Sequence, residues 1–148
     1  TPQWIATVNE AELAFALQRE ARQHADALSP GLLQRVVRGS AIPVLDYLVA
    51  KGAMPELARA FDAPFAEFDL ILCPAALGGA PKGLGSTGNP IMQTVWTFGG
   101  LPAVSLPLLT LSGGLPLGVQ AVGRRHDDAR LLRSARWLVR EFADRSMA

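Results

Sequence analysis

The residues of this chain that could act as nucleophiles, bases or metal ligands are few and widely spaced. Its only cysteine is Cys73, its two histidines are His24 and His126, and its two lysines are Lys51 and Lys82. A metal site needs several ligands at short, regular spacings, and these residues share no such spacing. A lone cysteine also excludes an internal disulfide and is typical of a reducing compartment. We therefore expect no metal site and no disulfide.

Two of these residues need separate consideration as catalytic groups. Lys82 and Ser86 could form a base and a nucleophile, but they lie in a Gly/Pro-rich stretch, and nothing nearby desolvates the lysine to lower its pKa. Cys73 follows a short apolar run without a base beside it, so it is interpreted as a buried, inert thiol. Spacing alone leaves a Ser/His/Asp triad open, although no G-x-S-x-G motif accompanies either histidine.

Residues 83–88 read Gly-Leu-Gly-Ser-Thr-Gly and match the dinucleotide-binding pattern G-x-G-x-x-G. That site requires the motif directly after a strand and before a helix, with an acidic residue about 20 positions further on. Here the nearest apolar run ends at Cys73, and no acidic residue occurs between Asp69 and Asp127. The motif is interpreted as a flexible loop, and no cofactor is expected.

The elements that must position any site centre on residues 70–123, where Lys82 is the only charged side chain. Because charges are almost never fully buried unless they are paired, this stretch predicts the interior of a globular fold. Pro and Gly interrupt it too often for the ~18 uninterrupted apolar residues of a membrane span. Irregular backbone inside a core needs hydrogen-bond partners, so we expect the functional site in this stretch.

The N-terminal part of the chain predicts helices. Asn9 with Glu12 three residues later is the pattern of a capping box, and it predicts a helix from Asn9 to about residue 28. Ser29 followed by Pro30 predicts a second helix that Gly39 ends. A third helical segment over residues 40–61 is expected to kink or break near residues 52–54.

The C-terminal part predicts a mixture of strands and helices. Trp96 lies on an expected apolar helix over residues 91–98, which Gly99 and Gly100 end. A final amphipathic helix is expected to begin at Asp127 or Asp128 and to reach about residue 144. Apolar runs predict three strands, at residues 69–73 (buried on both faces), 103–106 and 117–122. A loop is expected at residues 75–90, and a turn at residues 112–114.

Composition limits the partners of the chain. The net charge is +1 and the basic residues form no tract, so we expect no nucleic-acid partner. Residues 1–10 have neither the basic region nor the apolar core of a signal peptide, which makes the cytoplasm the expected location. Charged residues are only 18% of the chain, against an ordinary value of about 25%, so some apolar surface is expected to meet a partner or a missing segment.

Four motifs carry a resemblance to a known family. They are Phe-Asp-Leu-Ile-Leu-Cys-Pro at 68–74, Ser-Thr-Gly-Asn-Pro at 86–90, Trp-Thr-Phe-Gly-Gly-Leu-Pro-Ala-Val-Ser-Leu-Pro at 96–107 and Gly-Leu-Pro-Leu-Gly-Val-Gln-Ala-Val-Gly at 114–123. In this order, followed by Asp127-Asp128, they resemble the C-terminal portion of the amidase signature family. The resemblance is strong over residues 68–138 and loose before them. It treats residues 1–148 as a single segment of an amidase domain, mostly helical over 1–67, with strands, Gly/Pro loops and the final helix over 68–148.

The resemblance implies an α/β fold, specifically the C-terminal part of an α/β/α layered fold around a mixed sheet. It also implies hydrolysis of a carboxamide C–N bond by a Ser–cis-Ser–Lys triad, in which a serine forms an acyl-enzyme and backbone N–H groups hold the oxyanion. The family's Gly/Ser-rich signature and its lysine lie upstream of the part matched here, and neither Lys51 nor Lys82 is at a matching place. We therefore assign no catalytic residue and expect the segment to be inactive alone.

What the resemblance carries over is part of a substrate pocket. In the family, the region matching Thr87, Gly88 and Asn89, with the following helix that holds Trp96, borders the acyl or amide side of the pocket. Polar groups on a charge-free loop suit a neutral small-molecule amide. The alternative is that Thr87 and Asn89 only satisfy local turn hydrogen bonds and that Trp96 is a core residue.

A second function remains open, that of a non-catalytic module for association or sheet completion. Both functions require exposed apolar surface, which the composition supports. A sheet separated from its neighbouring strands exposes an edge that tends to pair with another copy. We therefore expect homodimers or aggregation.

Overall fold

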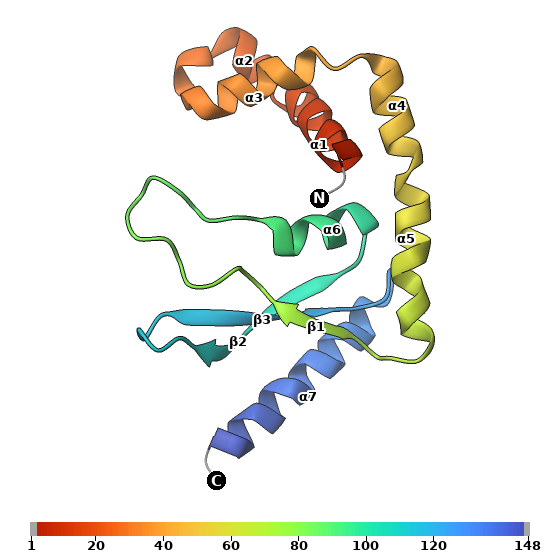
Figure 1. Cartoon of the computed structure of the whole chain (residues 1–148), viewed down its shortest axis with the longest axis vertical. Coiled ribbons are helices and arrows are strands. Elements are labelled where there is room, and N and C mark those ends of the chain that lie inside the picture. Colours follow the sequence, from red (N-terminus) through yellow and green to blue (C-terminus); the bar gives the residue numbers. More distant parts are fainter. Residues whose placement is uncertain (1–2, 147–148) are drawn as a thin grey trace. The chain divides into compact units, whose positions relative to one another are not determined.

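The structure, a computed structural model, describes residues 3–146, with side chains up to residue 142 in the final helix. The chain divides into two compact units, Thr1–Pro55 and Glu56–Ala148 (Figure 1). None of the helices in the described residues combines the length and the hydrophobicity needed to cross a bilayer. That residues 1–148 form a single segment of one amidase domain stays a prediction.

The first unit is helical. Its elements are α1 (Gln3–Ala16), α2 (Gln18–Gln23), a short 3-10 turn (Ala25–Ala27), α3 (Pro30–Ser40) and α4 (Val44–Gly52). The predicted start at Asn9 is wrong, because α1 begins at Gln3. Ile5 and Val8 are buried and extend the apolar stripe upstream, which places Asn9 inside the helix. The expected single helix to residue 28 is also wrong, because the chain is interrupted at Leu17 and ends its helical course at Gln23.

The start of α3 confirms the sequence prediction. The Ser29 hydroxyl accepts a hydrogen bond from the Leu32 backbone N–H at 3.3 Å, and Pro30 occupies the first helical position. Gly39 lies in the last turn of α3, where it packs on α1: a Cβ atom there would lie 2.0 Å from the carbonyl oxygen of Glu10. The close approach of the two helices therefore depends on the missing side chain.

Two acidic side chains join α1 to its neighbours in the first unit. Arg35 Nε donates to Glu10 Oε1 at 2.8 Å, and Arg38 Nε donates to Glu10 Oε2 at 3.4 Å. Burial acts to raise the pKa of Glu10, but the hydrogen bonds and charges of the two arginines lower it below its ordinary value of 4.5. Glu12 accepts a hydrogen bond from Lys51, which lowers the pKa of Glu12 and raises that of Lys51 above 10.5. Glu12 therefore serves α4 rather than a cap.

The third predicted helical segment is interrupted as expected. It consists of α4 and α5 (Met54–Asp62), and the break at Ala53 lies between Gly52 and Pro55. The segment starts at Val44 rather than at residue 40. Pro43 explains the later start, because a proline disfavours helical backbone in the residue before it.

The second unit is built on a three-stranded sheet. Its elements after α5 are a 3-10 turn (Ala63–Ala66), β1 (Ile71–Pro74), α6 (Ile91–Gly99), β2 (Ala103–Thr110), β3 (Pro116–Val122) and α7 (Asp128–Ser146). The strand order is β1-β3-β2, and both pairs are antiparallel. Figure 1 shows α6 on one face of the sheet and α7 on the other, so the α/β class is confirmed.

The position of β1 corrects one prediction. β1 is an edge strand with β3 on one side, and Leu72 is 47% exposed, so the strand is not buried on both faces. The strands in the described residues pair only antiparallel, whereas the mixed sheet that the resemblance implies belongs to the complete family fold. The predicted helix ends are confirmed: α6 ends at Gly99, followed by Gly100 in the left-handed conformation with φ 68°, and α7 begins at Asp128.

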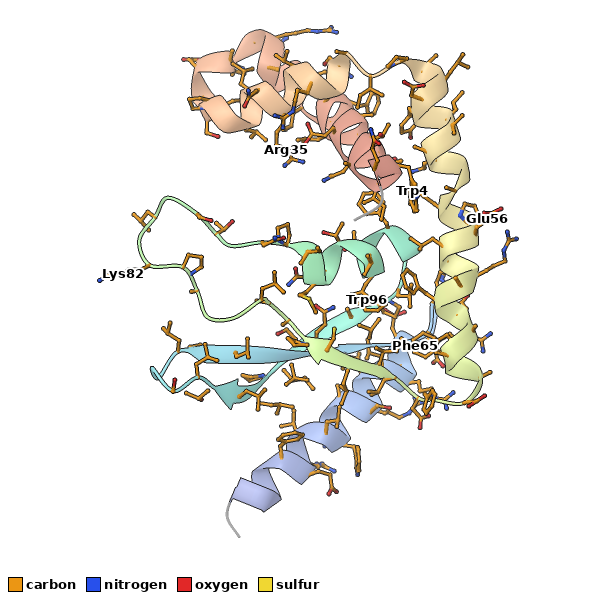
Figure 2. The ribbon with its side chains drawn as sticks, in the orientation of Figure 1. Trp4, Arg35, Glu56, Phe65, Lys82 and Trp96 are labelled. Atoms are coloured by element: carbon orange, nitrogen blue, oxygen red, sulfur yellow. The ribbon has the colours of Figure 1, made fainter. Side chains whose placement is uncertain are left out.

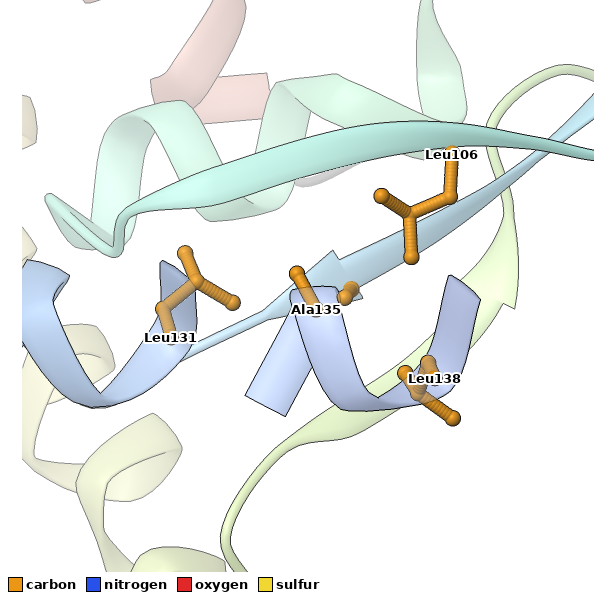
Figure 3. Packing of buried hydrophobic residues seen from close by; sticks show 5 residues of the cluster. Leu106, Leu131, Ala135 and Leu138 are labelled. Atoms are coloured by element: carbon orange, nitrogen blue, oxygen red, sulfur yellow. The ribbon is translucent and has the colours of Figure 1, made fainter. Parts of the chain in front are cut away.

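Two apolar clusters hold the helices to the sheet. The cluster under α7 is shown in Figure 3 and consists of Leu106, Ala121, Leu131, Ala135 and Leu138. The cluster on the α6 face consists of Phe65, Leu101 and Val122, with Phe61, Ile71, Cys73 and Trp96 packed against it. Side chains of β3 alternate between the two faces, so a strand in the middle of the sheet contributes to both clusters.

The prediction that residues 70–123 are interior is wrong for part of that stretch. Every residue from 81 to 90 is exposed, and Leu84 is fully exposed. In the described residues, nothing packs over the tip of this Gly/Pro-rich loop. Its low charge therefore reflects its composition of small residues rather than burial within this chain.

Candidate functional site

The loop between β1 and α6 is shaped by local hydrogen bonds. The Ser86 hydroxyl accepts from the Gly88 N–H at 3.1 Å, and Asn89 Oδ1 accepts from the Ile91 N–H at 3.0 Å. Gly88 has φ 95°, a conformation that side-chain-bearing residues rarely adopt. These turns bring Thr87, Gly88 and Asn89 to the N-terminal end of α6.

A hollow of about 430 Å³ lies between this end of the loop and its beginning. Three of the predicted site residues, Thr87, Gly88 and Asn89, line it together. Asn89 also satisfies a local turn bond, as the alternative interpretation expected, whereas no hydrogen-bond partner of the Thr87 side chain occurs in the described residues. The remaining lining residues are Ala76, Leu77, Gly78, Gly79, Ala80, Pro81, Pro90 and Gln93.

Trp96 lines a second hollow, of about 350 Å³, rather than the first. Its ring packs against Phe61, with centroids 5.1 Å apart at an interplanar angle of 59°, and it belongs to the cluster on the α6 face (Figure 2). Its indole N–H is buried without an acceptor in the described residues. Trp96 is therefore a core side chain that also walls a hollow. The other lining residues are Ala75, Gln93, Thr97, Leu101, Ala103, Ser105 and Gln120.

The two hollows adjoin at Gln93, which lines both of them. Its Nε2 donates a hydrogen bond to the carbonyl oxygen of Ala75, so it joins the first turn of α6 to the end of β1. The lining residues of both hollows, as far as the chain is described, include no charged side chain. Such a surface suits a neutral ligand with polar groups.

Sequence reasoning missed Gln93, Ser105 and Gln120. Gln120 is the most informative of them, because it is 4% exposed in the middle strand and donates from Nε2 to the Met92 carbonyl oxygen at 3.4 Å. A glutamine within an apolar strand is a signal that could have been noticed, since buried polar side chains need partners. Which helix it reaches depends on the tertiary fold.

The other residues considered for chemistry are not brought together. Lys82 extends from the exposed loop (Figure 2), and the Ser86 hydroxyl is used within its own turn. Cys73 is a half-buried free thiol in the cluster on the α6 face. His126 is exposed before α7, with a φ of 64°, and His24 is exposed in the other unit. Among the described residues, no group of three or more potential metal ligands occurs.

Comparison with known proteins identifies the family. The amidase profile matches residues 13–132, which is most of the chain. The chain belongs to the amidase family. The match includes the loop, both hollows and most of the sheet, so the candidate site lies within the amidase region.

Curated relatives from this family include one of the subunits of glutamyl-tRNA(Gln) amidotransferase. The protein from Neisseria meningitidis serogroup A is 38% identical over 96 residues, which cover 60% of this chain and 20% of that protein. The one from Agathobacter rectalis is 31% identical over 126 residues, which cover 77% of this chain and 25% of that protein. The chain thus spans about a fifth to a quarter of the length of these relatives.

Solved structures show the same fold. A crystal structure of an amidase matches with a TM-score of 0.80 at 23% identity, over 89% of this chain and 33% of that one. The structure of 6-aminohexanoate cyclic dimer hydrolase matches with a TM-score of 0.72 at 18% identity, over 91% of this chain and 34% of that one. The described fold is therefore an amidase fold segment, as the resemblance implied.

Proposed function

We propose that this chain is the C-terminal part of an amidase that hydrolyses a carboxamide C–N bond, and that it supplies one side of the substrate pocket. The observation that carries the proposal is the pair of uncharged hollows that adjoin at Gln93, inside the region matched by the amidase family. A carboxamide is neutral and both donates and accepts hydrogen bonds. A pocket of apolar walls with a few neutral polar groups suits such a ligand.

In the proposed reaction, the catalytic groups are a Ser–cis-Ser–Lys triad upstream of this chain. The nucleophilic serine oxygen attacks the amide carbon, the amine leaves with a proton relayed from that serine, and water then releases the carboxylic acid from the acyl-enzyme. The uncharged lining of both hollows supports this division, because no lysine or histidine in the described residues adjoins a serine there. The chain alone is expected to bind but not to cleave.

The pocket residues have distinct proposed roles. Thr87 offers a hydroxyl to the ligand, Gly88 keeps the loop backbone open through its positive φ, and Asn89 fixes the start of α6. Trp96 forms an apolar wall of the neighbouring hollow. The substrate is then a small neutral amide, held at the rim by the loop and at the wall by α6.

Ammonia release from benzamide tests this function. The 148-residue chain should release none, whereas the longer polypeptide of its source, identified by its intact mass, should hydrolyse the amide. In that polypeptide, Thr87→Val should raise KM by roughly threefold to tenfold, the effect of one hydrogen bond. Thr110→Val, a matched change on an exposed threonine outside both hollows, should leave KM unchanged. Hydrolysis by the 148-residue chain alone would contradict the assignment of the triad.

An alternative function is favoured by the edges of the sheet. β1 and β2 both lie at an edge within the described chain, and exposed edges pair readily with further strands. The chain would then act in association or sheet completion, with a homodimer as the simplest product. A monomer at high concentration in size-exclusion chromatography with light scattering would count against this alternative. We retain the cytoplasm as the proposed location, in line with the single free thiol.

A further inference from the structure

Two neutral polar side chains lie opposite each other on the sheet face that α6 covers. Ser105 of β2 and Gln120 of β3 are direct partners in the strand register. Side chains of such partners point to the same face, with Cβ atoms about 4.5–5.5 Å apart. Both residues line the hollow that Trp96 walls, so the pair forms part of its floor.

The contacts of Gln120 fix the orientation of its carboxamide. The Met92 carbonyl oxygen only accepts hydrogen bonds, so the amide nitrogen of Gln120 must face it, at 3.4 Å. This leaves Oε1 as the acceptor that Gln120 offers to the hollow it lines. Because Gln120 is 4% exposed, its amide has little freedom to turn away. The floor therefore presents a held acceptor.

The hydroxyl of Ser105 is held beside this acceptor by the shape of β3. A Cβ atom on Gly118 would lie 2.4 Å from Ser105 Oγ and 3.1 Å from the Cβ of Ala75. The glycine thus makes the space that the hydroxyl occupies. A serine hydroxyl donates one hydrogen bond, so Ser105 and Gln120 together offer one donor and one acceptor on neighbouring strands.

We propose that Ser105 and Gln120 bind a neutral amide group of the ligand: the Ser105 hydroxyl donates to its carbonyl oxygen, and Gln120 Oε1 accepts from its N–H. The inference deepens the proposed amidase function and rests on it. No bond breaks at this pair, because the lining residues of the hollow include no base to activate the serine. The two residues are specificity determinants that distinguish an amide from groups lacking an N–H.

Nuclear magnetic resonance titration of the 148-residue chain tests the pair without requiring catalysis. The probes are benzamide and acetophenone, which have the same ring and carbonyl but differ in an amino or a methyl group. Benzamide should shift the backbone resonances of Ser105 and Gln120 and the indole resonance of Trp96. It should bind roughly threefold to tenfold more tightly than acetophenone, the effect of one hydrogen bond.

Substitutions separate the two roles. Gln120→Met keeps the length of the side chain and should abolish the preference for benzamide over acetophenone. Ser105→Ala, at an exposed position that folding tolerates, should weaken both probes by roughly threefold to tenfold. Ser112→Ala, a matched change in the exposed turn between β2 and β3, should alter neither.

Every outcome bears on the inference. Binding at these residues with equal affinity for both probes, or with no effect of Ser105→Ala, would overturn the amide-binding role and leave the proposed amidase function standing. Benzamide shifts confined to residues outside both hollows, or no shifts at all, would overturn the inference and also count against the proposed pocket.

Discussion

Replacing Gly39 by alanine should destabilise the helical unit, although alanine is the better helix former. An added Cβ atom would lie 2.0 Å from the carbonyl oxygen of Glu10, 2.6 Å from its carbonyl carbon and 2.8 Å from the Cβ of Ala14. Two of these neighbours are backbone atoms of α1, which cannot rotate away. The helices must therefore move apart, and Ile5 and Val8, buried on α1, lose packing.

The size of the effect follows from two opposing terms. Overpacking of a close contact destabilises a fold by about 1–3 kcal/mol, and occasionally more. The higher helix propensity of alanine returns up to about 1 kcal/mol. Because the clash is with backbone, the overpacking should fall at the upper end, and a net loss of about 2 kcal/mol is expected.

Gly31→Ala is the matched control, since it lies on the same helix and its added Cβ would meet no atom within 4 Å. It should be neutral or stabilising by up to about 1 kcal/mol. Hydrogen exchange of the α1 and α3 amides measures the stability of this unit, and the β3 amides report on the other unit. Equal protection of the α3 amides in Gly39→Ala and Gly31→Ala would refute the close-packing argument.

Three further results are expected from urea unfolding. Burial opposes it, but the arginine hydrogen bonds lower the pKa of Glu10, so its contribution is present above pH 4.5 and lost as the pH falls through its folded pKa; Glu10→Gln should flatten this acid dependence. Ser29→Ala removes a helix cap and should lose about 1 kcal/mol, whereas Ser40→Ala at the other end of α3 should not; equal losses would argue against the cap. Leu131→Ala in the α7 cluster should lose about 2–5 kcal/mol. Leu132→Ala on the exposed side should stay within about 0.5 kcal/mol, and similar losses for both would contradict the described face of α7.

The sequence predicts those features whose cause is local. Ser29 with Pro30, the Gly99-Gly100 pair and Asp128 each act within one helical turn, and the structure places helix ends at all of them. The capping box at Asn9 failed although its pattern is local. The buried residues Ile5 and Val8 continue the helix past it, and their burial depends on α3 and α4.

The candidate site was less predictable because it depends on contacts between distant segments. Thr87, Gly88 and Asn89 could be singled out, since polar residues on a charge-free loop are visible in the sequence. Ser105 and Gln120 gain their meaning from the register of two strands, and that register includes a shift between Leu106 and Leu109. Burial of β1 was overestimated for the same reason, since an apolar run does not reveal whether the strand has one neighbour or two.

The exposed loop between β1 and α6 has a consequence for how the second unit is held together. Lys82 is the only lysine or arginine between Arg59 and Arg124, and it projects from a loop tip where every neighbour is accessible to a protease. Trypsin acting on the folded chain would therefore nick the unit after Lys82. β1 on one side of the nick pairs with β3 on the other, and Asp69 pairs with Arg130 across it. The two pieces should stay associated, so the covalent connection through this loop is dispensable for keeping the sheet assembled.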